Sequence, residues 1–373
     1  MTNILIITSR TGGGHMNLAL SLKDMLGARF SIDIVDPFPP VVDRYYAGLS
    51  RNFLTLWDWQ YKYTDNEFAS LCLHKGLALL GQKRIAGLIE QAAPQLIVST
   101  HALLSYVVAS ANRQTGLHIP LAFQLTDLEC VHTTWFSEKF ADAYLTPTRE
   151  IFAQASAEGI EQGRLHITGR PVRKQFLQTY DSACRAETLA SLGLSPDAFT
   201  VFLQGGAKGS ARIERTISSI FAAGSARAPI QIILAAGSNS AIISRFSAIP
   251  SLRVLPFTET IAPYMAASDL IVGKAGASFL TEAIMLEKPS LITTYIPGQE
   301  GPNLRFIERY NLGWTCLDAR GQQKLLTRIV RNPDLIAEKV SSIQSYKQWN
   351  MSANASIPSV FNRLLGYQDT LEA

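Results

Sequence analysis

The stretch Ile4-Leu5-Ile6-Ile7-Thr8-Ser9-Arg10-Thr11-Gly12-Gly13-Gly14-His15 decides the fold. Its apolar beginning predicts a buried strand, and its three glycines predict a tight loop. A helix follows, because Leu18, Leu22 and Leu26 recur at helical spacing. Residues 31–35 then have the pattern of a second strand, so the chain opens with the strand, helix, strand unit of a parallel α/β sheet.

The same alternation continues and divides the chain in two. A length of 373 residues is too great for one ordinary core, which favours two domains. The predicted strands of the first half are residues 4–8, 31–35, 96–99, 121–125, 143–145 and 165–167. Those of the second half are residues 200–204, 231–235, 252–255, 270–273 and 289–293. We therefore predict Rossmann-like α/β domains at residues 1–170 and 175–345, a hinge near residues 169–180, and a last helix at about 350–366 that packs back on the first domain.

Composition narrows the class of protein. Hydrophobic residues make up 47% and charged residues 17% of the chain, which excludes disorder by composition. The net charge of +4 is mild, so we expect no nucleic-acid partner, although it suits docking on an anionic membrane surface. The four cysteines are scattered, and neither a metal site nor a disulfide framework is suggested. The short apolar start and the lack of a long apolar stretch predict a cytoplasmic chain that does not span a membrane.

The first glycine loop is a candidate catalytic site. Glycines let a backbone approach a ligand, and the helix that begins near His15 offers N–H groups and a positive dipole end. The dipole disfavours a charged imidazole, so we expect His15 to be neutral near pH 7 and able to accept a proton. The loop lacks the G-x-G-x-x-G spacing, which argues against hydride transfer. The alternative is a tight turn with an incidental histidine.

Two loops in the second half share this feature, with glycines and other small residues directly after a predicted strand. Gln204-Gly205-Gly206-Ala207-Lys208-Gly209-Ser210 adds a cation that can offset the charge of a diphosphate, and it lacks the ending of a Walker A loop. Gly273-Lys274-Ala275-Gly276-Ala277-Ser278 opens a helix after a strand, which is the setting of an anion site. Glu282, one turn further, can accept hydrogen bonds from the hydroxyls of a ribose. An exposed lysine and an exposed glutamate are the alternatives.

Two more polar segments follow predicted strands. Thr126-Asp127-Leu128-Glu129-Cys130-Val131-His132-Thr133-Thr134-Trp135-Phe136 places a carboxylate, Asp127, where it could orient His15 or replace it as a base. Gly298-Gln299-Glu300-Gly301-Pro302-Asn303 supplies amide and carboxylate groups that can bind sugar hydroxyls. All five segments follow strand C-termini, so two facing domains would gather them around one cleft.

An aromatic-rich insertion occupies residues 37–83, between the second and third predicted strands. Its rings, among them Trp57 and Trp59, alternate with lysines and arginines. These residue types together suit a lipid headgroup boundary. The alternative is that most of the rings pack on the sheet.

Five segments in this order resemble one family. They are T-G-G-G-H at 11–15, T-D-L-x-x-x-H-x-x-W-F at 126–136, G-R-P-V-R at 169–173, G-G-x-x-G at 205–209 and P-G-Q-E at 297–300. The sequence resembles the monogalactosyldiacylglycerol synthase family, which includes bacterial diacylglycerol glucosyltransferases and is similar to the peptidoglycan N-acetylglucosaminyltransferase. The resemblance extends over residues 4–345. It implies a GT-B fold, with two Rossmann-like domains facing across a cleft, and an inverting enzyme that uses a UDP-sugar.

The resemblance also implies roles for single residues. His15 matches the histidine proposed as base or acceptor-positioning group, Glu282 matches the ribose-binding glutamate, and Phe257 matches the backbone position that pairs with uracil. With these, the predicted catalytic residues are His15 and Asp127. The predicted donor-binding residues are Gly14, Gly205, Gly206, Lys208, Gly209, Ser210, Phe257, Lys274, Gly276, Ala277, Ser278, Glu282, Gly298, Gln299, Glu300 and Asn303. The predicted acceptor or membrane side comprises Gly13, His132, Trp135, Phe136, Trp57 and Trp59.

The resulting prediction is transfer of galactose or glucose from a UDP-sugar to the hydroxyl of diacylglycerol, without a metal or other cofactor, on the inner face of a membrane. Two departures weaken the acceptor and sugar assignments: Ala277-Ser278-Phe279 where lipid synthases often have P-G-T, and Thr133 where a proline is usual. The alternatives are an N-acetylglucosamine transferase acting on a lipid-linked cell-wall intermediate, a UDP-sugar epimerase, and a non-catalytic UDP-sugar-binding or membrane-scaffold protein.

Overall fold

The computed structural model describes residues 1–11, 13–39, 48, 53–204, 213–225, 228–237 and 239–367. The predictions for Gly205, Gly206, Lys208, Gly209 and Ser210 lie outside these residues. The chain forms two compact units. Unit 1 comprises Met1–Lys174, Pro297–Asn303 and Trp349–Ala373, and unit 2 comprises Gln175–Ile296 and Leu304–Gln348. The short segment Pro297–Asn303 therefore groups with the N-terminal part of the chain.

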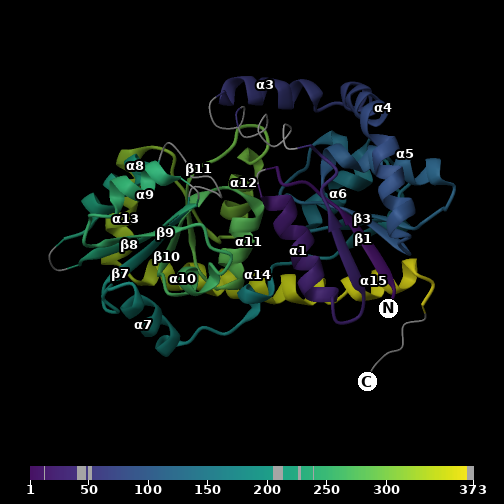
Figure 1. The fold of residues 1–373 in the computed structure, drawn as a ribbon. Helices are drawn as coiled ribbons and strands as arrows, with labels where there is room; N and C mark the ends of the chain where they lie inside the picture. Colours follow the sequence, from purple (N-terminus) through teal and green to yellow (C-terminus); the bar gives the residue numbers. More distant parts are fainter. Residues whose placement is uncertain are drawn as a thin grey trace. The chain divides into compact units, whose positions relative to one another are not determined.

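Unit 1 is built on a six-stranded parallel sheet (Figure 1). Its strands are β1 Asn3–Ile7, β2 Ser31–Val35, β3 Leu96–Ser99, β4 Leu121–Gln124, β5 Ala143–Thr146 and β6 Leu165–Ile167, in the order β2-β1-β3-β4-β5-β6. Alternate residues of β1 point to opposite faces of the sheet. Ile4 and Ile6 enter one core, and Leu5 and Ile7 enter the other. The apolar run at the start of the chain is thus covered on both sides, as parallel sheets require.

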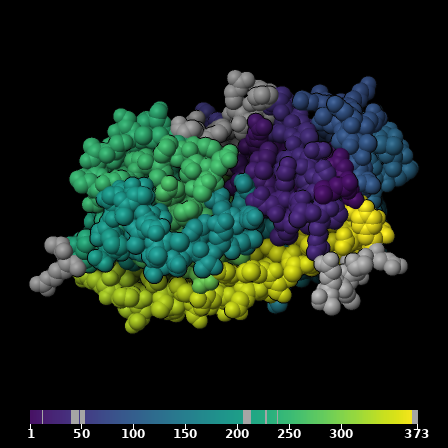
Figure 2. Space-filling view, turned by 60° about the horizontal axis from the view of Figure 1, so that its bottom comes forward, coloured from purple at the N-terminus to yellow at the C-terminus, as the bar shows by residue number. Residues whose placement is uncertain are grey.

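Helices cover both faces of this sheet. α1 (Gly14–Leu26) and α15 (Ile357–Leu364) pack on the face of Ile4 and Ile6. In Figure 2 the yellow atoms near the C-terminus lie beside the purple N-terminal segment. The other face is covered by α4 (Glu67–Ala92), α5 (Ala102–Thr115) and α6 (Arg149–Ala157). α3 (Leu54–Thr64) precedes α4 and contains no buried residue, so it lies outside both cores.

Unit 2 contains a second six-stranded parallel sheet in the Rossmann order β12-β11-β10-β7-β8-β9. Its strands are β7 Phe199–Gln204, β8 Ile230–Gly237, β9 Leu252–Pro256, β10 Leu270–Lys274, β11 Ser290–Thr294 and β12 Gly313–Thr315. Its helices are α7 Ser182–Ser191, α8 Ile213–Ala223, α9 Ser240–Phe246, α10 Ala262–Ala266, α11 Ala277–Met285 and α13 Ala319–Arg331. Two more helices, α12 Gly301–Arg309 and α14 Asp334–Asn354, have one end in each unit.

The strand order of each sheet reverses at one point. In unit 1 the reversal lies between β1 and β3, and in unit 2 it lies between β7 and β10. Open α/β sheets bind ligands outside the C-terminal ends of the strands at such a point. In unit 1 this places the loop before α1 beside Thr100, and in unit 2 it selects the loop between β10 and α11. The loop after β7 lies outside the described residues.

The segment that follows β6 is fastened to the end of α14. Asn350 accepts from the backbone N–H of Arg170 at Oδ1 (2.8 Å) and donates to its carbonyl from Nδ2 (3.1 Å). Asn354 donates to the carbonyl of Thr168 at 2.7 Å. Gly169 lies between these bonds with a φ of 65°. The predicted hinge region therefore begins with residues that are held inside unit 1, and the first unit boundary follows at Lys174.

Candidate active site

His15 lies in the first turn of α1, directly after the loop from β1. Its Nδ1 is 2.7 Å from the carbonyl oxygen of Thr100, the residue that follows β3. A carbonyl only accepts, so Nδ1 carries the hydrogen in this contact. The neutral ring then has its lone pair at Nε2, which is the nitrogen able to take a proton from a substrate.

The charge state of His15 follows from its surroundings. Burial lowers the pKa of His15 from 6.5 to about 4. The hydrogen bond to Thr100 opposes this shift, and the positive charge of Arg170 adds to it. Arg170 is itself buried and donates from Nε to the carbonyl of Thr126 at 3.0 Å. His15 is therefore neutral at pH 7 and can act as a base.

His101 is a second histidine at this point, and it is not among the predicted site residues. Its ring centroid lies 4.2 Å from that of His15. Its Nδ1 accepts from the backbone N–H of Leu103, so its Nε2 donates to Thr11 Oγ1 at 2.9 Å. Burial holds the pKa of His101 well below 6.5. A sequence feature could have pointed to His101: the segment Ser99-Thr100-His101 ends a predicted strand of the same half as the glycine loop.

Asp127 follows β4 in unit 1 and contacts the segment Pro297–Asn303. Asn303 donates from Nδ2 to Asp127 Oδ1 at 3.4 Å, and its Oδ1 accepts from the backbone N–H of Leu128 at 3.2 Å. Burial, and then the negative charge of Glu300, raise the pKa of Asp127 to about 6. The hydrogen bond from Asn303 and the charge of Arg170 oppose this rise. Asp127 therefore titrates close to neutral pH, in the range of a general base.

Asn303 has a structural role in unit 1. Its side chain is fully buried and binds both Asp127 and the adjacent backbone. It therefore fastens the first turn of α12 to the end of β4, and its contact with a donor stays a prediction. Gln299 and Glu300 lie in the same segment, between Gly298 and α12.

The predicted acceptor-side residues separate into two groups. Trp135 and Phe136 form part of a short 3-10 helix, Thr133–Phe136, and both rings are buried in the core of unit 1. The two rings complete the core beside α5, so neither is exposed at the surface, and their place on the acceptor side stays a prediction. Trp59, by contrast, is 62% exposed on α3, and Trp57 is partly buried on the same helix.

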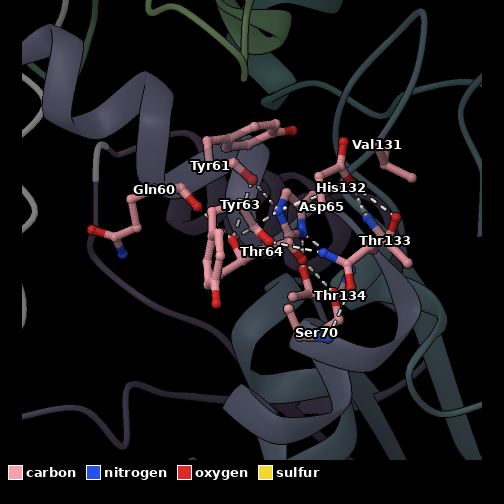
Figure 3. Close-up of polar contacts among 12 residues, drawn as sticks. Gln60, Tyr61, Tyr63, Thr64, Asp65, Ser70, Val131, His132, Thr133 and Thr134 are labelled. Carbon is pink, nitrogen blue, oxygen red and sulfur yellow. Dashed lines mark hydrogen bonds and ion pairs between the residues drawn. The ribbon is translucent and has the colours of Figure 1, made fainter.

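His132 joins the segment after β4 to the end of α3 (Figure 3). Its Nδ1 accepts from the backbone N–H of Thr134, so its Nε2 faces the carbonyl of Tyr61 at 3.1 Å and donates to it. Asp65 Oδ1 accepts from both the backbone N–H and the hydroxyl of Thr133, each at 2.8 Å. The segment after β4 thus anchors the end of α3. Burial lowers the pKa of His132, although the charge of Asp65 opposes this.

In unit 2 the predicted donor-binding residues lie around the start of α11. Gly276 precedes the helix in an extended conformation and supplies no side-chain cap, and Ala277 and Ser278 form its first turn. Lys274 ends β10, and Glu282 is a buried residue on α11, four positions beyond Ser278. Phe257 follows β9 and is 64% exposed. Small residues at a helix start after a parallel strand form a site suited to a phosphate.

The comparisons with known proteins agree with this architecture. Residues 31–172 match the family model of monogalactosyldiacylglycerol (MGDG) synthase, and residues 200–339 match that of the glycosyltransferase family 28 C-terminal domain. A probable monogalactosyldiacylglycerol synthase 2 of Oryza sativa subsp. indica is 26% identical over 352 residues, which cover 87% of this chain and 73% of that protein. Monogalactosyldiacylglycerol synthase 3 of Arabidopsis thaliana is 28% identical over 331 residues, covering 82% and 69%.

Solved structures share the fold at low sequence identity. MurG of Acinetobacter baumannii has a TM-score of 0.63 at 13% identity and covers 97% of this chain and 100% of its own. Anabaena HepE in complex with UDP-glucose has a TM-score of 0.61 at 13% identity, with the same coverage. These two likenesses show the fold.

Two Rossmann-like units and these relatives define an enzyme of the GT-B glycosyltransferase class. The N-terminal part of the chain is thus similar to monogalactosyldiacylglycerol synthases, and the C-terminal part is similar to the C-terminal domain of family 28 glycosyltransferases.

Among the described residues, no helix combines the length and apolar character that crossing a bilayer needs. The same part of the chain contains no cluster of three His, Cys, Asp or Glu side chains arranged to hold a metal ion.

Proposed function

We propose that this enzyme transfers a hexose from a UDP-hexose to the hydroxyl of diacylglycerol and inverts the anomeric centre. The observation that carries this proposal is the bond from His15 Nδ1 to Thr100, which leaves Nε2 as a neutral base in unit 1. The similarity to monogalactosyldiacylglycerol synthases supports both the reaction and the lipid acceptor.

The chemistry is a single displacement. The acceptor hydroxyl attacks the anomeric carbon from the face opposite the diphosphate, and its proton passes to His15 Nε2. Asp127 is the second candidate base, because its pKa of about 6 leaves most of it ionised at pH 7. The bond between the anomeric carbon and the diphosphate oxygen breaks, and UDP departs with the electron pair.

We assign the nucleotide to unit 2. The start of α11 binds the diphosphate through backbone N–H groups, and Lys274 and Lys208 offset its charge. Glu282 accepts from the ribose hydroxyls, and the backbone at Phe257 pairs with uracil. Gln299 and Glu300, in unit 1, bind the transferred sugar. The reaction uses no metal ion in this proposal.

We assign membrane contact to α3, on the cytoplasmic side of a membrane. Phe53, Leu56, Trp59 and Tyr63 are each at least half exposed, and they recur at about helical spacing. Lys62 is exposed on the same helix. Exposed aromatic and aliphatic side chains beside a cation suit an interface with anionic lipids.

The test is transfer from radiolabelled UDP-galactose and UDP-glucose to diacylglycerol in mixed anionic vesicles, read by thin-layer chromatography. A labelled glycolipid with β configuration, formed equally well with EDTA, is expected, and the better donor identifies the sugar. Incorporation only into a lipid-linked cell-wall intermediate would replace the acceptor assignment. Interconversion of the two UDP-sugars without a lipid product would replace transfer by epimerisation.

A further inference from the structure

The ring of Tyr61 contacts both the segment after β4 and the turn that precedes Gln299. Its centroid lies 4.5 Å from that of His132, in an edge-to-face arrangement. At Gly298, a Cβ atom would stand 2.7 Å from Tyr61 Cδ1 and 2.9 Å from Cγ. The backbone of Gly298 thus approaches the ring more closely than any other residue type would allow. Tyr61 and Gly298 belong to the same compact unit.

The backbone around Tyr61 is held independently of its ring. His132 Nε2 donates to the carbonyl of Tyr61, and Thr64 Oγ1 lies 3.2 Å from the same nitrogen (Figure 3). Ser70 donates to the carbonyl of Thr64 at 2.7 Å. The last turn of α3 is therefore fixed on the segment after β4, so removal of the Tyr61 ring leaves the helix anchored.

The turn that Tyr61 supports carries the sugar-binding candidates. Gly298 has a φ of 74°, and Gln299 and Glu300 follow it directly. Three residues later, Asn303 is bound to Asp127 and to the N–H of Leu128. The turn is thus held at its far end by Asn303 and at its near end by the Tyr61 ring.

The surroundings of Tyr61 keep its phenol uncharged. Burial, and then the negative charges of Asp127 and Asp65, raise the pKa of Tyr61 above its usual value. The phenol is therefore neutral at every physiological pH, and the contact with Gly298 is a packing contact at all of them.

We propose that Tyr61 is a positioning residue, whose ring holds the turn at Gly298 so that Gln299 and Glu300 meet the hexose of the donor. This inference rests on the proposed function for its substrate. It assigns α3 two opposite faces: Trp59 and Tyr63 are exposed, and Tyr61 supports the donor turn. A helix that contacts lipid on one face therefore also orders the site on the other.

The test compares Tyr61→Ala with Tyr61→Phe, which keeps the ring. Thr55→Ala is the control, because Thr55 lies on the same helix, is exposed and has no part in the apolar surface assigned to membrane contact. Tyr61→Ala is expected to lower kcat/KM for UDP-hexose by about 10- to 100-fold, mainly through KM, because a small misplacement of a binding group has effects of this size. Tyr61→Phe and Thr55→Ala are expected to stay within about threefold of the wild type.

Two binding measurements separate positioning from other roles. Calorimetry should show that Tyr61→Ala weakens UDP-hexose and leaves UDP, which lacks the sugar, unchanged. Sedimentation with anionic vesicles should give wild-type binding. Unchanged affinity for UDP-hexose, an equal loss of UDP, or a loss confined to vesicle binding would each overturn the inference. If the wild type formed no glycolipid, the proposed acceptor would fail, while the ratio of UDP-hexose to UDP affinity would still decide the role of Tyr61.

Discussion

His15 Nδ1 lies 2.7 Å from the carbonyl oxygen of Thr100, so a backbone atom at the end of β3 selects the tautomer of a side chain at the start of α1. The two residues follow neighbouring parallel strands, and both strands end at the point where the sheet order reverses. The topology therefore brings a candidate base and its orienting group together.

Substitution of His15 tests this arrangement. His15→Gln is expected to lower kcat/KM by about 10²- to 10⁴-fold, the usual contribution of a general base, while UDP binding to unit 2 persists. His118→Asn is the control, because His118 is an exposed histidine of unit 1 with a positive φ that asparagine tolerates. Transfer by a folded, UDP-binding His15→Gln protein at the wild-type rate would rule out the base assignment.

The pH dependence distinguishes the two candidate bases. The pKa of His15 is about 4 and that of Asp127 is about 6, so only Asp127 changes charge between pH 5 and 7. If the Asp127 carboxylate takes part, kcat/KM rises through a midpoint near pH 6. Asp127→Asn should then lower the rate and remove this midpoint, because His15 stays neutral over the range. A midpoint near 6 that persists in Asp127→Asn would assign the titration to another group.

Asp127→Asn is expected to lower the rate of transfer but to raise the stability of the fold. A carboxyl with a raised pKa binds its proton more tightly in the folded than in the unfolded chain, so its contribution is full below about pH 4 and is lost as pH rises through about 6. Asp127→Asn removes the cost of a buried charge. The variant should therefore gain Tm relative to the wild type at pH 8 and show a smaller gain at pH 5, as read by calorimetry at both values.

The sequence predicted the strands more reliably than the contacts between them. Buried parallel strands are nearly continuous apolar runs, and eleven such runs were placed within two residues of their observed bounds. β12, Gly313–Thr315, was not predicted, because its sequence Gly-Trp-Thr is not an apolar run. The aromatic character of a residue did not show whether its side chain points into the core or to solvent. Trp135 is buried, whereas Trp59 is exposed. The Asn303–Asp127 contact joins positions 176 residues apart, and no local spacing encodes it.

Substitution of Gly169 tests how much the contacts from the end of α14 stabilise unit 1. A Cβ at Gly169 would lie 2.7 Å from Asn354 Nδ2 and 2.8 Å from the carbonyl of Asn350, and φ is 65°. Gly169→Ala should therefore lower the free energy of unfolding by about 2–3 kcal/mol. Gly159→Ala is the control: its φ is 87°, but the space around it is open, so it should cost about 1 kcal/mol. Equal losses in urea unfolding would mean that the Asn350 and Asn354 contacts contribute nothing.

The exposed face of α3 predicts where the protein meets lipid. Leu56→Ser with Trp59→Ser removes two exposed apolar side chains from α3, and should reduce binding to anionic vesicles by about tenfold or more, since each buried side chain contributes about 1.5–3 kcal/mol. Leu117→Ser is the control, because Leu117 is 52% exposed after α5 and away from α3. Cosedimentation measures both. Equal binding by the double variant and the wild type would place the membrane contact elsewhere.

Gly298→Ala tests the same contact from the backbone. The substitution creates a clash with the Tyr61 ring, and removal of that ring relieves the clash. Gly298→Ala introduces a Cβ that meets the Tyr61 ring at 2.7 Å and adds the strain of a φ of 74°. The control is Gly116→Ala, which has a φ of 69° and open space, and so reports the backbone strain alone. Gly298→Ala should lower kcat/KM for UDP-hexose by about tenfold more than Gly116→Ala does. In a Tyr61→Ala background the added loss from Gly298→Ala should shrink, because the ring that it meets is gone; additive losses would show that the two residues act on catalysis separately.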